Sequence, residues 1–143
     1  MVRVLHIADV HLGASLSFLG DKARERQKDL EDAFVRAIEF ALTPEHRIDL
    51  VIIAGDLFES QNPSHHLIQL VKSKFSLLHE TGIPVALVPG THDSYAYATS
   101  VYHNEETFPG VILLHSPNIG EPVEINIRGV SVYLYGMVWD RYE

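Results

Sequence analysis

The chain has 143 residues, of which 46% are hydrophobic and 21% are charged, a composition ordinary for one soluble globular domain. It contains no cysteine, which excludes disulfides and thiolate-based catalytic or metal sites. The net charge of −8 excludes the strongly basic balance that phosphate neutralisation favours in nucleic-acid-binding chains. Its apolar runs are far shorter than the ~20 residues of a membrane span, and its start lacks a signal-peptide layout. We therefore expect a soluble, cytoplasmic protein without membrane contact.

Short apolar strands alternate with amphipathic helices in the first part of the chain. The expected strands are residues 2–8, 50–54 and 84–88. Residues 21–42 carry apolar side chains at helical spacing. A second helix is expected after Asn62 as N-cap, with Pro63 in its first turn and Gly82 at its end. This alternation predicts an α/β fold with parallel strands and right-handed crossovers.

The remainder of the chain has a different pattern. Residues 94–108 are polar and aromatic and predict a short helix plus a loop, followed by a strand at 111–114. Residues 123–127 and 130–135 alternate between apolar and polar side chains on either side of Arg128-Gly129. This pattern predicts a β-hairpin with a tight turn, so the expected order is β-α-β-α-β followed by a hairpin.

Each of the three predicted parallel strands runs directly into polar residues. The first is followed by Asp9 and His11, the second by Asp56, and the third by the segment Gly90-Thr91-His92-Asp93. Ligands of open α/β sheets bind beyond the carboxyl ends of the strands, so neighbouring strands would bring these groups together. The alternative is that they are caps and turn residues of an unrelated α/β fold.

The residue types in these segments suit a metal centre. Asp9 and His11 are two positions apart, so in an extended chain both project to one side. A carboxylate with an imidazole suits Mn, Fe or Zn, and Asp56 could bridge two cations about 3.5–4 Å apart. Such centres hydrolyse phosphate esters. His92 is the candidate general acid, and Asp93 could orient its imidazole.

The longer segments around these residues resemble the calcineurin-like metallophosphoesterases, and within them the SbcD-type DNA-repair exonuclease branch. The segments that carry the resemblance are residues 5–13, 55–58, 62–64, 82–85 and 90–94. The resemblance implies an αββα sandwich of two facing sheets flanked by helices. We expect residues 1–143 to be the N-terminal portion of a single metallophosphoesterase domain, with the second half absent from this chain.

The resemblance also implies a role for each residue of the signature. Asp9 and His11 would ligate the first metal ion, Asp56 would bridge both ions, and His92 would be the general acid that contacts phosphate. Thr91 stands where the family has an asparagine whose carbonyl oxygen ligates the second ion. Because a threonine hydroxyl is a shorter and poorer donor, this ligand would be weakened.

Partners and cofactors follow from the same resemblance. Members of this branch usually use two manganese ions and cut DNA ends together with an SbcC-type ATPase, so a phosphodiester such as DNA and such an ATPase are the expected partners. The family's later motifs, a lone histidine and a Gly-His-x-His segment, have no counterpart in this chain. The three ligands Asp9, His11 and Asp56 cannot fill two coordination spheres alone. A half-domain would also expose apolar surface that favours self-association.

Three functions therefore stay open. The first is a metal-dependent phosphoesterase of nuclease type, a DNA exonuclease or phosphodiesterase, to which this chain contributes the N-terminal part. The second is a scaffold or interaction protein that keeps the fold but not a competent site, which Thr91 motivates. The third is a phosphoesterase acting on small nucleotides, which the acidic composition mildly favours.

Overall fold

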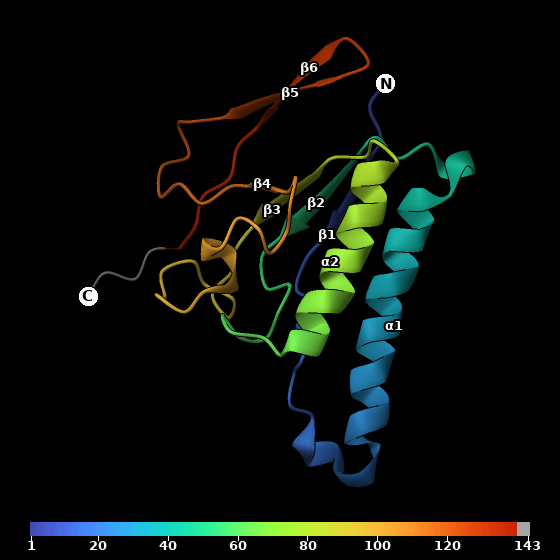
Figure 1. The fold of residues 1–143 in the computed structure, drawn as a ribbon, viewed down its shortest axis with the longest axis vertical. Helices are drawn as coiled ribbons and strands as arrows, with labels where there is room; N and C mark the ends of the chain where they lie inside the picture. Colours follow the sequence, from blue (N-terminus) through green and yellow to red (C-terminus); the bar gives the residue numbers. More distant parts are fainter. Residues whose placement is uncertain (140–143) are drawn as a thin grey trace.

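Four parallel strands form the central sheet of the computed structural model, which describes residues 1–139. The strands lie in the order β1 (Val4–Ile7), β2 (Leu50–Ala54), β3 (Val85–Val88) and β4 (Ile112–Leu113). A separate antiparallel pair is made by β5 (Val123–Ile127) and β6 (Val130–Leu134) (Figure 1). Residues 140–143 of the expected domain portion lie outside the described residues.

Two helices cover one face of the central sheet (Figure 1). They are α1 (Ala23–Leu42) and α2 (His65–Glu80), and each buries one stripe of apolar side chains. The buried side chains are Phe34, Ile38 and Ala41 of α1 and Leu67, Val71, Phe75 and Leu78 of α2. They pack against β2 and β3 in the main hydrophobic core. Three short 3-10 helices, η1 (Ser17–Lys22), η2 (Pro44–His46) and η3 (Val101–His103), lie in the connections.

The hairpin of β5 and β6 contributes to a second, smaller core on the other face of the sheet. Ile127 and Leu134 of the hairpin pack with Leu50 of β2 and Ala86 of β3. Because neighbouring residues of a strand point to opposite faces, this core uses the alternate residues of the central strands. The central sheet is thus sandwiched between the helices and the hairpin, as a two-sheet α/β fold requires.

The expected order of elements and the parallel sheet are confirmed. The hairpin turn is also confirmed: Arg128 and Gly129 both have positive φ, as a type I′ turn requires. The predicted N-cap of the second helix was wrong. Ser64 caps α2, since its side chain accepts a hydrogen bond from the backbone nitrogen of Leu67 at 3.4 Å.

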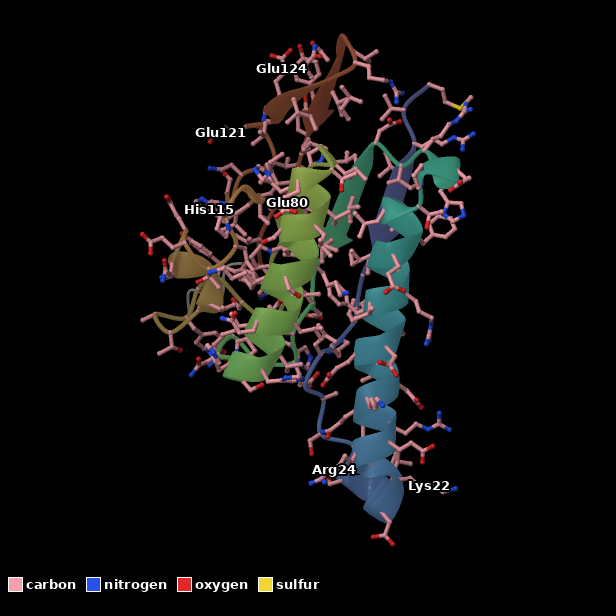
Figure 2. All side chains as sticks on the ribbon, turned by 45° about the vertical axis from the view of Figure 1, so that its right-hand side comes forward. Lys22, Arg24, Glu80, His115, Glu121 and Glu124 are labelled. Carbon is pink, nitrogen blue, oxygen red and sulfur yellow. The ribbon has the colours of Figure 1, made fainter. Side chains whose placement is uncertain are left out.

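Charged side chains gather differently at the two ends of the molecule. Figure 2 shows Lys22 and Arg24 beside the start of α1, and Glu121 and Glu124 at the opposite end. The basic residues at the start of α1 alternate with acidic ones, and Arg26 pairs with Asp29 on the same helix at 2.9 Å. This arrangement is that of a solvated helix face. None of the helices described between residues 1 and 139 has the length and apolar character needed to cross a membrane.

Candidate metal centre

The loops that follow β1, β2 and β3 are tied to one another by backbone hydrogen bonds. The nitrogen of Asp9 donates to the oxygen of Gly55 at 3.2 Å, and that of His11 donates to the oxygen of Asp56 at 2.9 Å. The nitrogen of Gly55 in turn donates to the oxygen of Val88, the last residue of β3, at 3.0 Å. The parallel pairing therefore continues past the strands and holds the first two polar loops side by side.

Asp9, His11 and Asp56 all have left-handed backbone conformations, with φ of 53°, 52° and 49°. This region is uncommon for residues other than glycine, although aspartate and histidine enter it more readily than most. Among the described residues only two other non-glycine residues, Arg47 and Arg128, have positive φ. Backbone strain of this kind clusters where side chains must be aimed for function, and here the hydrogen bonds between the loops hold it in place.

His11, Asp56 and His92 come together from the three loops. Each offers one ligand atom, and these atoms all lie within 4.8 Å of one another. Nε2 of His11 is 3.9 Å from a carboxylate oxygen of Asp56. The rings of His11 and His92 meet edge to face, with centroids 4.9 Å apart. The structure thus brings one predicted residue from each loop to a common point.

Glu59 is a member of this site that sequence reasoning missed. Its Oε2 lies 2.7 Å from Nδ1 of His11, and its Oε1 lies 3.5 Å from Nδ1 of His92. Glu59 reaches the two rings because a parallel bridge joins Leu12 to Phe58 beyond the ends of β1 and β2. A lone glutamate after an apolar pair gives no local signal, so only the register of the two loops reveals it.

Gly90 allows the third loop to approach Asp56. A Cβ atom at Gly90 would overlap the carboxylate and the backbone nitrogen of Asp56. Glycine is needed at position 90 because there is no space for a side chain beside Asp56, and not because of the flexibility of its backbone. The backbone nitrogen of His92 donates to Oδ1 of Asp56 at 2.9 Å, which further fixes the carboxylate against the third loop.

Asp93 is fully buried, and its carboxylate holds the third loop in place through hydrogen bonds. It accepts hydrogen bonds from the backbone nitrogens of Gly90 at 2.7 Å and Phe58 at 3.2 Å, and from the hydroxyl of Tyr102 at 2.6 Å. Burial, followed by the charge and hydrogen bonding of Asp93, raises the pKa of Tyr102 well above its usual value. These hydrogen bonds join the third loop to the loop after β2 and to η3, while the imidazole of His92 faces Glu59. That Asp93 orients His92 remains a prediction.

Two further predicted residues lie at the margin of the cluster. Asp9 is exposed and does not belong to the group of ligand atoms that lie within 4.8 Å of one another. Thr91 is also exposed, and it lines a cavity beside His92. Their parts in metal binding therefore remain predictions.

The donor set fits one divalent cation. An imidazole nitrogen of His11 and a carboxylate oxygen of Asp56 form the mixed N/O environment that borderline cations such as Mn, Fe and Zn accept, and the imidazole of His92 lies within the same group. Nδ1 of His11 faces Glu59, which leaves its Nε2 directed toward Asp56 for a metal ion. Such carboxylate–histidine pairs fix the ring orientation of metal ligands in proteins.

The chain resembles known proteins both in sequence and in structure. Residues 2–139 match the model of the calcineurin-like phosphoesterase family. The chain also resembles a solved nuclease, MPE from Pseudomonas putida, with a TM-score of 0.53 and 21% sequence identity. The match covers 84% of this chain and 51% of the nuclease, so the chain spans about half the length of that protein.

Proposed function

Because this chain belongs to the calcineurin-like phosphoesterase family, we propose that it carries the metal-binding part of a divalent-metal-dependent phosphoester hydrolase. The convergence of His11, Asp56 and His92 at the ends of three loops is the observation that supports this most directly. Their ligand atoms lie within 4.8 Å of one another although the residues are far apart in sequence. Turn and cap residues of an unrelated fold would have no reason to converge in this way.

Each of the chain's own residues would have its own role in such a site. His11 and Asp56 would hold the cation, Asp9 would complete the first coordination sphere, and Asp56 would be shared with a second ion that Thr91 binds weakly. Divalent cations in such centres neutralise phosphate oxygens and make water more acidic. We propose manganese as the cation, with iron and zinc as alternatives.

His92 would donate a proton to the leaving oxygen of the ester. Its side chain is 47% exposed, so a substrate can reach it. Its backbone is held by the hydrogen bond to Asp56, which places the ring beside the carboxylate that would hold the cation. Histidine suits this role because its ordinary pKa lies close to neutral pH.

We propose a phosphodiester as the substrate class, with DNA as the first candidate. The segments similar to SbcD-type exonucleases support this, and the solved protein that shares the fold is itself a nuclease. Manganese-dependent cutting of DNA ends with an SbcC-type ATPase partner is the most specific form of the proposal. A mononucleotide ester is the alternative substrate.

The test is hydrolysis of bis(p-nitrophenyl) phosphate by the purified protein with added Mn. Asp56→Ala should abolish the activity, because it removes the carboxylate at the centre of the ligand group. Asp32→Ala is the matched control, since Asp32 is an exposed carboxylate on α1, and it should retain full activity. Unchanged hydrolysis by the Asp56 variant would contradict the assignment.

A scaffold function is the second candidate, and Thr91 is the observation that favours it. Its hydroxyl stands where the family resemblance implies an asparagine ligand, and Asp9 does not belong to the ligand group. Calorimetric titration with Mn separates the two candidates. Tight binding of two cations per chain would exclude the scaffold, whereas absence of any binding would support it.

A further inference from the structure

A cavity of about 680 Å³ adjoins the candidate metal centre. Glu59 and His92 form the wall that it shares with the ligand cluster. The volume lies within the range of pockets that bind small organic ligands, which is about 300–1,000 Å³. A phosphate held at the metal centre would therefore have room beside it for an attached group.

Two exposed aromatic side chains line this cavity. Tyr97 is 53% exposed and Trp139 is 63% exposed, although both are large and apolar enough to be buried. They come from distant segments: Tyr97 follows the third polar loop, and Trp139 follows the hairpin. Two aromatic rings that face one cavity offer π surfaces to a planar ligand.

The backbone near both aromatic residues is held in place. The nitrogen of Ser100 donates to the oxygen of Tyr97 at 2.9 Å, and that of Val101 donates to the oxygen of Gln61 at 2.8 Å. Next to Trp139, the nitrogen of Val138 donates to the oxygen of Ser116 at 3.1 Å. The two aromatic residues are thus carried by segments that are anchored to the fold, which lowers the entropy cost of binding a ligand against them.

The side chains that line the cavity favour an uncharged part of a substrate over a second phosphate. Among the residues that the structure describes, the lining contains no lysine or arginine, and its carboxylate and imidazole members, Glu59 and His92, already belong to the metal centre. The remaining polar members, Gln61, Thr91 and Ser94, offer amide and hydroxyl groups that can hydrogen-bond base edges or a sugar. The described part of the lining thus offers no cationic side chain to a second phosphate, whereas it offers a neutral planar ring both stacking surfaces and hydrogen-bonding groups.

We propose that this cavity binds the nucleobase of a nucleotide ester whose phosphate lies at the metal centre. The inference rests on the proposed phosphoesterase function and adds to it the part of the substrate that lies beside the scissile bond. Tyr97 and Trp139 are the residues that determine this preference. The substrate class is therefore a nucleotide ester rather than a simple alkyl or sugar phosphate.

Trp139 provides a direct measurement of base binding, because it is the single tryptophan of the chain. Adenosine, which lacks phosphate, should quench its fluorescence saturably, while ribose should not. Tyr97→Ala should weaken adenosine binding by about tenfold, the size expected for one lost stacking contact. Tyr133→Ala is the matched control, since Tyr133 is 54% exposed on β6 and is not among the residues that line the cavity, and it should bind adenosine as the unmodified chain does.

The outcomes separate this inference from the proposed function. Adenosine binding should persist in excess EDTA, because the cavity recognises the base without the metal ion. Absence of saturable quenching, loss of binding in EDTA, or equal weakening by the two tyrosine variants would each overturn the inference. None of these results depends on hydrolysis. If Asp56→Ala leaves hydrolysis unchanged while adenosine still binds, the proposed function fails and the base site stands.

Discussion

Nδ1 of His11 lies 2.7 Å from Oε2 of Glu59, and this contact fixes which nitrogen of the ring can bind a metal ion. With its hydrogen on Nδ1, the ring donates a hydrogen bond to this carboxylate. Nε2, on the side of Asp56, then carries no hydrogen and can bind a metal ion. Such a carboxylate partner also fixes the orientation of the ring of a histidine ligand. Glu59 therefore shapes the metal centre although sequence motifs do not include it.

Glu59→Gln should weaken Mn binding by about 10- to 100-fold, the range measured when such supporting partners of metal ligands are lost. The amide keeps the size of the side chain but removes the charge that orients His11. Titration calorimetry with Mn measures the affinity. Glu124→Gln serves as the control, because Glu124 is an exposed carboxylate on β5 and does not belong to the ligand group. The Mn affinity of this variant should match that of the unmodified chain. Equal affinities for both variants would show that Glu59 has no such role.

Gly90→Ala should disrupt the centre through a single added methyl group. The new Cβ would overlap the carboxylate and backbone of Asp56, so the third loop must shift away from Asp56. Overpacking of this kind costs about 1–3 kcal/mol in the free energy of unfolding, and we expect Mn affinity to fall as well. Urea denaturation and calorimetry measure the two effects. Gly120→Ala is a suitable control, since a Cβ there meets no atom within 4 Å; a Gly90 variant that behaves like it would contradict the packing argument.

The strands, the hairpin and the three polar loops could be predicted because their signals are local. Apolar runs mark the strands, and the residues after them lie at the carboxyl edge of a parallel sheet. Glu59 could not be predicted, because its contact with His11 depends on the pairing of Leu12 with Phe58. The hydrogen bond between Asp93 and Tyr102 could not be predicted for a similar reason: Tyr102 belongs to a short 3-10 helix in a segment without periodicity.

Tyr102→Phe should lower the free energy of unfolding by about 1–3 kcal/mol, because Asp93 is fully buried and loses one hydrogen-bond donor. The same tyrosine should make the protein sensitive to alkali. Burial first, and then Asp93, raise the pKa of Tyr102 in the folded state above its unfolded value near 10. The stability that the protonated phenol contributes is therefore complete below about pH 10 and is lost as pH rises above it.

Urea denaturation between pH 8 and pH 11 tests this dependence. The unmodified chain should lose stability more steeply above pH 10 than Tyr102→Phe, which has no phenol to ionise at that position. Tyr133→Phe, an exposed tyrosine on β6, should follow the unmodified chain. Parallel curves for all three proteins would mean that Tyr102 does not carry the effect.

His92→Gln distinguishes a proton donor from a metal ligand, since the ring lies close enough to His11 and Asp56 to be either. As the general acid, His92 matters most when the leaving oxygen is a poor leaving group. We expect hydrolysis of a dinucleotide to slow by about 10²- to 10⁴-fold, while a p-nitrophenyl ester, whose leaving group needs no proton, is affected far less. Mn affinity, measured by calorimetry, should stay near that of the unmodified chain. His115→Gln, an exposed histidine away from the ligand group, controls for the loss of an imidazole. Equal slowing of both esters together with weaker Mn binding would instead identify His92 as a ligand.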